Sequence, residues 1–187
     1  MLAHDQKIIH SSVEANWRTP GLCFLALDRA FHFVYDLAAD RESALCPKWL
    51  GPGGEAEDAL VVDWTPLLHG EAGFLNPPYS KKEKQPIGPW LEKCWMESQK
   101  GCTIVGLIPF APQTVHYTKY VYGFDAEGVW SGHAAMEEWR LPHRISYLRP
   151  DGSPAGNAGV NSVVIVWRPN PGFVGPWTPA TRYWSYR

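Results

Sequence analysis

The stretch Phe74-Leu75-Asn76-Pro77-Pro78-Tyr79-Ser80 decides the fold of this chain, together with the apolar run that leads into it from Ala72. The run predicts a buried strand. The two prolines end it, because each fixes its own φ, lacks an N–H and pushes the preceding residue into an extended conformation. We therefore expect a rigid exit from the sheet that presents the Asn76 amide and the Tyr79 ring beside unpaired backbone carbonyls.

This exit is a candidate binding site. Ligands of open α/β sheets bind outside the carboxyl ends of the strands, so the stretch would clamp a planar molecule that carries an amino group. The alternative is a proline-rich loop without function. The chain has 17 prolines in 187 residues, so a Pro-Pro pair alone is weak evidence for a binding site. The flanking sequence has to distinguish the two interpretations.

Length and charge restrict the class of protein. A chain of 187 residues suits one domain. We expect a single domain over 1–187, with a peripheral leader at 1–15 and an extended tail rich in proline and aromatic residues at 168–187. The net charge of −2 gives no overall basic character, so contact with nucleic acid would need a local basic patch.

The cysteines do not suggest a metal site. Cys23, Cys46, Cys94 and Cys102 show no CxxC spacing and no histidine at a zinc-like distance, so we expect reduced, buried thiols and no bound metal. The sequence shows no signal peptide and no membrane-spanning run. The default expectation is a soluble cytoplasmic protein, and the oligomeric state stays open.

Hydrophobic spacing predicts alternating strands and helices around the central stretch. The unit of helix 89–99 followed by strand 102–108 is what a doubly wound sheet requires after the first strand. We expect helices at 22–30, 89–99 and 113–122, strands at 31–37, 57–64, 102–108, 141–148 and 161–167, and loops at 51–54 and 125–133.

Asn-Pro-Pro-Tyr resembles the catalytic motif Asp/Asn/Ser-Pro-Pro-Tyr of S-adenosylmethionine-dependent methyltransferases that modify exocyclic amino groups. The order of further motifs over about residues 16–167 resembles the small phage-type DNA N6-adenine methyltransferases of the Dam group. These motifs are Trp17-x-Thr19-Pro20, an aromatic strand, Asp36-x-Ala38-Ala39, Ala44-Leu45-Cys46, Asp58-Ala59-Leu60 and Asp63-Trp64. Ser43-Ala44 stands where that family often has Asn-Ala.

The resemblance implies a cofactor site for S-adenosylmethionine. Asp36 would meet the methionine ammonium, the backbone around Ala38 would allow close approach, and Thr19 and Pro20 would line the same pocket. Asp58 would accept a hydrogen bond from the amino group of the cofactor's adenine. Without the resemblance, Asp36 would be interpreted as a helix N-cap, because an aspartate that ends a strand often has that role. Asp58 would be interpreted as a turn residue or a solvated charge.

The resemblance also implies the catalytic residues Asn76, Pro77, Pro78 and Tyr79. The Asn76 side-chain oxygen and a proline carbonyl can accept both hydrogens of an adenine amino group, and an aromatic ring can stack on a base flipped out of double-stranded DNA.

Three lysines follow the motif, at Lys81, Lys82 and Lys84. Beside a base pocket they would contact DNA phosphates. The alternative is a solvated surface loop.

The expected fold is α/β, a trimmed Rossmann-like class I methyltransferase sheet flanked by helices, with a closing antiparallel strand pair near the C-terminus. It is trimmed because only residues 37–75 separate Asp36 from Asn76, too few for the usual helix–strand repeats. The alternative functions are methylation of cytosine N4 or of another amino group, including one in RNA or protein. A third is a catalytically silent relative that binds DNA or nucleotides.

Overall fold

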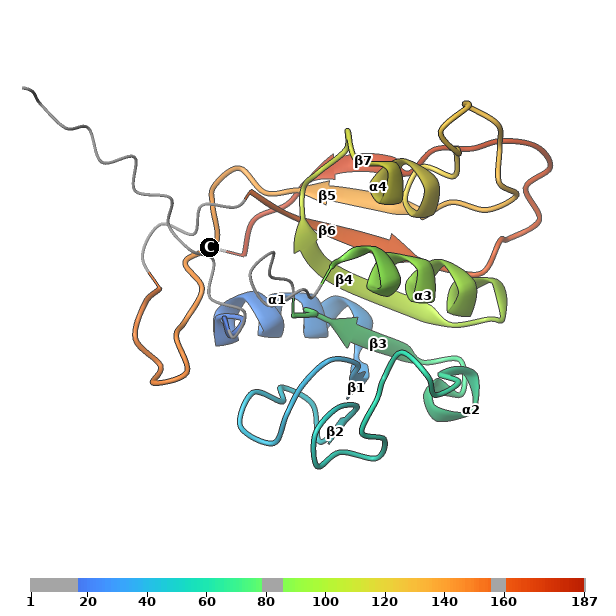
Figure 1. Cartoon of the computed structure of the whole chain (residues 1–187). Coiled ribbons are helices and arrows are strands. Elements are labelled where there is room, and N and C mark those ends of the chain that lie inside the picture. Colours follow the sequence, from blue (N-terminus) through green and yellow to red (C-terminus); the bar gives the residue numbers. More distant parts are fainter. Residues whose placement is uncertain (1–16, 79–85, 156–160, 187) are drawn as a thin grey trace, which may run out of the picture.

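The computed structural model describes residues 17–78, 86–155 and 161–186. Over these residues a seven-stranded sheet has the order β2-β1-β3-β4-β6-β5-β7 (Figure 1). The strands are β1 Phe33–Asp36, β2 Lys48–Trp49, β3 Ala72–Leu75, β4 Thr103–Pro109, β5 Glu137–Arg140, β6 Ser162–Trp167 and β7 Ala180–Tyr183, and the helices are α1 Gly21–Phe31, α2 Thr65–Leu68, α3 Gly88–Gln99 and α4 Val115–Tyr120. This confirms the predicted α/β class with a Rossmann-like sheet.

Alternate residues of the central strand β4 pack into two separate apolar cores, because successive side chains of a strand point to opposite faces. Ile104 and Ile108 belong to the core that includes residues of α3 and α4. Val105 and Leu107 belong to the core that includes residues of α1. The sheet is therefore a middle layer between helices. None of the described helices is long and apolar enough to cross a membrane.

The half of the sheet that carries the central stretch is parallel. Strands β2, β1, β3 and β4 all run the same way. Asp36 at the end of β1 is in register with Phe74 of β3, and the Leu37 N–H donates to the Phe74 carbonyl over 2.8 Å. The chain leaves both strands at the same edge of the sheet. Between β1 and β3 it forms the two-residue strand β2 and the four-residue helix α2, which is the trimmed connection that the sequence predicts.

The closing antiparallel pair is confirmed, but the predicted position of one of its strands is wrong. β6 pairs antiparallel with β4 and with β5, and β5 is Glu137–Arg140, not 141–148. Residues 141–148 are irregular, with one isolated bridge between Leu148 and Arg18. Pro142 cannot donate to a ladder, while Ile145 and Tyr147 are buried in the α1-side core. The apolar spacing there reflects burial without sheet pairing.

The predicted strand at 57–64 is also wrong. Residues 59–62 form a turn and Val61 is 80 % exposed. The Asp58 carboxylate accepts a hydrogen bond from the Leu60 N–H over 2.9 Å, and the Asp63 carboxylate accepts one from the Thr65 N–H at the start of α2 over 3.0 Å. Aspartate side chains that bond backbone N–H groups two residues ahead favour turns over strands.

The C-terminal tail contributes to the sheet. Within it, β7 pairs parallel with β5 and forms the edge strand next to it. The sequence predicts an extended segment here but no strand, because the side chains of β7 are exposed and so carry no alternating pattern of burial.

Candidate active site

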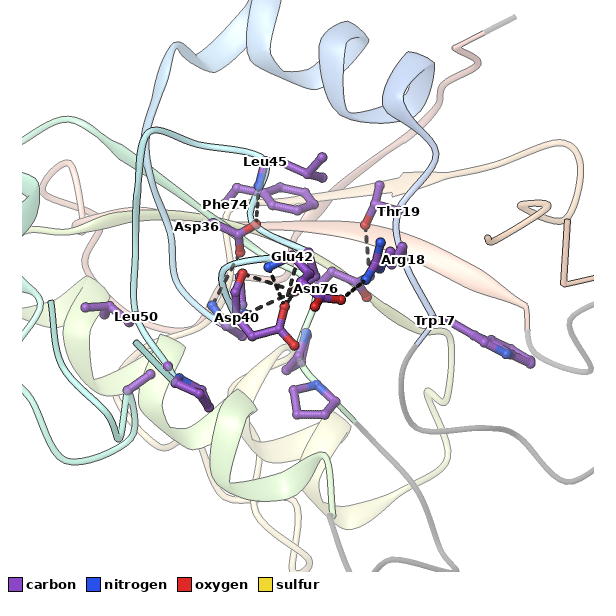
Figure 2. A pocket seen from close by; sticks show the side chains of 18 of the residues that line it. Trp17, Arg18, Thr19, Asp36, Asp40, Glu42, Leu45, Leu50, Phe74 and Asn76 are labelled. Carbon is purple, nitrogen blue, oxygen red and sulfur yellow. Dashed lines mark hydrogen bonds and ion pairs between the residues drawn. The ribbon is translucent and has the colours of Figure 1, made fainter. Parts of the chain in front are cut away.

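A cavity of about 390 Å³ opens at the carboxyl ends of β1 and β3, within the size range of ligand pockets. Figure 2 shows Thr19, Asp36 and Asn76 around it. It is lined by residues from segment 17–19, from the turn after β1, from the loop after β2, from 57–59 and from 76–78, and by Trp90 and Pro150. These segments lie far apart in the sequence and meet because the parallel strands end at one edge.

Most of the predicted site residues lie together in this cavity. Its lining includes Thr19, Asp36, Ala38, Asp58, Asn76, Pro77 and Pro78. Pro20 is not among the lining residues and occupies the N-cap of α1. Four predicted residues fall outside the described part of the chain: Tyr79, Lys81, Lys82 and Lys84.

Asp36 is the most deeply buried charged group of the cavity, with 3 % of its surface exposed. Its Oδ2 accepts a hydrogen bond from the Leu45 N–H over 3.1 Å, and its Oδ1 accepts one from the Ala38 N–H over 3.4 Å. Burial raises the pKa of Asp36 to about 6, although these two hydrogen bonds act in the opposite direction. A positive ligand group beside it would favour the ionised carboxylate.

The turn after β1 is held close to the segment after β2. The Leu50 N–H donates to the Asp36 carbonyl over 2.9 Å, and the Ala39 N–H donates to the Leu50 carbonyl over 3.0 Å. Gly51 has a φ of 128°, and a Cβ there would lie 2.2 Å from the Ala39 carbonyl oxygen. Glycine is therefore required at this contact, and the alanine side chains at 38 and 39 leave room in the cavity.

A second aspartate, Asp40, organises the rim of the cavity. Its Oδ1 accepts hydrogen bonds from the Glu42 N–H, the Ser43 N–H and the Ser43 hydroxyl, over 3.0, 2.8 and 2.8 Å. Burial acts to raise the pKa of Asp40, but these hydrogen bonds outweigh it and the pKa is lowered. Ser43 stands where the resembling family often has asparagine, and here it closes this turn.

Asn76 and Thr19 are joined directly. The Asn76 Nδ2 donates a hydrogen bond to the Thr19 Oγ1 over 2.8 Å, which Figure 2 shows as a dashed line. Thr19 is buried, and Asn76 lies immediately after β3 and is followed by the two prolines of the cavity wall. The amide therefore stands at the end of a rigid strand and is contacted by the segment that precedes α1.

Acidic groups outnumber basic ones in the lining. Asp36, Asp40, Glu42, Glu57 and Asp58 line the cavity, whereas Arg18 is the one lysine or arginine among the described lining residues. Arg18 forms an ion pair with Glu42 over 3.1 Å. The cavity thus suits a ligand with positive groups and hydrogen-bond donors. No cluster of three or more metal-ligating side chains occurs within residues 17–78, 86–155 and 161–186.

Sequence reasoning missed several lining residues. Arg18 lies next to Thr19 in the chain and could have been inferred from that position. Glu42, Glu57 and Trp90 carry no such signal. Trp90 lies in the first turn of α3, half-buried and with access to the cavity.

Comparison with known protein families gives a match over most of the chain. Residues 6–174 match the family described as DNA N-6-adenine-methyltransferase (Dam). No curated protein and no solved structure matches the chain. The matched range contains the whole lining of the cavity and both strands that position it. The chain therefore belongs to the DNA N-6-adenine-methyltransferase (Dam) family.

Proposed function

We propose that this protein transfers a methyl group from S-adenosylmethionine to the N6 amino group of adenine in double-stranded DNA. Family membership supports the reaction class. The observation that carries the proposal is that Asn76 and Asp36 line one cavity from the ends of two adjacent parallel strands. This supports a single site in which Asn76 would accept from an amino group and the buried Asp36 carboxylate would meet a cation.

The residues present fit the cofactor. When bound, S-adenosylmethionine supplies a methyl group on a positively charged sulfur. Asp36 would hold the methionine ammonium, since its carboxylate is buried and accepts hydrogen bonds from backbone N–H groups alone among the described residues. Ala38 leaves space beside it. Asp58 uses Oδ1 to close its own turn, and its other oxygen would accept from the cofactor's adenine amino group.

The chain's residues would activate the target amino group by orientation. Its nitrogen lone pair is delocalised into the adenine ring and is a poor nucleophile. The Asn76 Oδ1 and a carbonyl of the Pro77-Pro78 pair would accept its two hydrogens, draw the nitrogen toward tetrahedral geometry and aim the lone pair. The methylated nitrogen is acidic enough to lose its proton to water, so no strong base is needed. Tyr79 would stack on the flipped base.

The product of the reaction tests this function. The protein is incubated with DNA and a donor that carries a tritium-labelled methyl group, and the DNA is digested to nucleosides. We expect the label in N6-methyldeoxyadenosine. Label in N4-methyldeoxycytidine would support the cytosine alternative instead. DNA binding without incorporated label would support the alternative of a catalytically silent relative. Label in RNA or protein would show that the methylated amino group belongs to that class of substrate.

Salt dependence tests the proposed phosphate contacts of Lys81, Lys82 and Lys84. Replacing all three by alanine should weaken binding to every DNA sequence alike, because phosphate contacts carry no base information. The slope of log affinity against log salt concentration should become shallower by about 0.9 for each phosphate that a lysine no longer neutralises. Filter binding or fluorescence anisotropy at several salt concentrations measures it. An unaltered slope would indicate that the three lysines do not contact phosphates, and would support the alternative of a solvated surface loop.

A further inference from the structure

We propose that Thr19 is a positioning residue that holds the Asn76 amide in place beside the target amino group, and that it is not primarily a cofactor contact. The inference rests on the proposed function and adds to it a residue that acts through Asn76. Its basis is the hydrogen bond from the Asn76 Nδ2 to the Thr19 Oγ1 over 2.8 Å, made in a buried place where Thr19 is 5 % exposed.

An asparagine amide has two unlike ends. Nδ2 carries two donors, and Oδ1 accepts. Only Oδ1 can accept hydrogen bonds from an adenine amino group, whereas a reversed amide would set donors against donors. The terminal Asn76 torsion is broad and has little intrinsic preference, so a partner outside the side chain is needed to hold the amide in place. The Thr19 hydroxyl is that partner and accepts from Nδ2. Because a hydroxyl can also donate, this bond fixes the position of the amide, and the donors of the substrate select its Oδ1 end. No described residue donates to Oδ1, which leaves it available to substrate.

Thr19 is itself held by its two chain neighbours. The Arg18 N–H donates to the Leu148 carbonyl over 2.8 Å, and the Leu148 N–H donates back to the Arg18 carbonyl over 3.0 Å. On the other side, the Pro20 carbonyl accepts from the Phe24 N–H over 3.1 Å at the start of α1. The hydroxyl is thus anchored to the irregular segment before β6 and to a helix, so its position does not depend on a bound ligand.

Substitutions that separate the hydroxyl from the shape of the side chain test the inference. Thr19→Val keeps the volume and removes the acceptor. We expect kcat to fall by about tenfold, the effect of losing one hydrogen bond and leaving the Nδ2 donor unpaired. The calorimetric Kd for S-adenosylmethionine should stay within about twofold. Thr19→Ser restores the acceptor and should recover most of the turnover. Thermal unfolding of each variant checks that the fold is kept.

The Asn76→Ala background gives a second readout that a purely structural role would not move. Alanine has no amide for the Thr19 hydroxyl to hold, so a residue that acts through Asn76 has nothing left to position. Thr19→Val should therefore cost much less turnover in this background than in the native one. Equal losses in both backgrounds would show that Thr19 supports the fold or the pocket in general, and would overturn the inference.

The remaining outcomes are distinguishable. If Thr19→Val weakens cofactor binding with kcat unchanged, Thr19 is a cofactor contact and the inference is wrong. It is also wrong if Thr19→Val keeps native kcat, or if Thr19→Ser is as impaired as Thr19→Val. Failure of the proposed function has another signature, the absence of methyl transfer by the native protein or native turnover by Asn76→Ala. If turnover by Asn76→Ala is too low to measure, the comparison of Thr19→Val with Thr19→Ser decides between the positioning role and a structural one.

Discussion

Asn76→Ala is expected to lower methyl transfer by about 10²- to 10³-fold, the loss typical of removing one preorganised polar group that acts in a transition state. The variant loses the acceptor that orients the amino group. It keeps the Asp36 carboxylate and the proline wall of the cavity, so cofactor and DNA should still bind. Single-turnover kinetics with labelled donor, combined with separate binding measurements, separates the chemical step from binding.

Two control variants sharpen this test. Asn76→Asp keeps an acceptor oxygen at the same place and should retain far more activity than alanine. Asn161→Ala removes an asparagine whose Oδ1 accepts from the Arg144 Nε on the surface, outside the cavity lining, and should leave turnover unchanged. If Asn76→Ala kept native turnover, the assignment of the central stretch as a methyltransferase site would be wrong.

Asp36→Asn is expected to weaken S-adenosylmethionine binding by about 1.5–3 kcal/mol, the contribution of a hydrogen bond to a charged group, or about 10- to 150-fold in Kd. Asparagine keeps the size and one acceptor for the neighbouring N–H groups, so the fold should persist. Asp40→Asn is the matched control, because asparagine keeps the Oδ1 that accepts hydrogen bonds from Glu42 and Ser43. Isothermal calorimetry measures both, and equal affinity of native and Asp36→Asn proteins would remove Asp36 from the site.

The same carboxylate predicts a dependence of affinity on pH. The pKa of Asp36 is raised to about 6 by burial, so below pH 6 the ligand-free protein carries a neutral carboxyl. Binding of an ammonium requires the charged form, and the affinity should fall by up to tenfold per pH unit below about 6. Above about pH 6 the affinity should no longer change with pH through Asp36. The Asp36→Asn variant should lack this pH dependence at every pH.

This loss would not be acid unfolding, because its sign is opposite. The folded-state pKa lies above the ordinary value of 3.8, so between these two values the folded protein binds more protons than the unfolded one. The contribution of Asp36 to the free energy of unfolding therefore rises as pH falls through this window. If affinity and thermal stability declined together as pH falls, a titratable group other than Asp36 would be responsible for the loss of affinity.

The sequence by itself determined the features that depend on local pattern. The apolar run before Asn76 and the helix–strand unit that follows it are present as β3, α3 and β4. The resemblance to the Dam group is confirmed by the family match. The predictions of the strand and of the helix–strand unit succeed because proline restriction and hydrophobic spacing act between near neighbours. The roles of the individual site residues stay predictions.

Only the tertiary structure decided the features that depend on distant partners. The apolar pattern at 141–148 reflects burial of Ile145 and Tyr147 in the core that includes residues of α1, and it is Glu137–Arg140 that pairs with β6. Gly51 matters because the chain passes the Ala39 carbonyl there. Thr19 contacts Asn76 across 57 residues of sequence. Such contacts exist only in the folded chain, because packing and hydrogen bonds depend on distance in space and no local pattern encodes that distance.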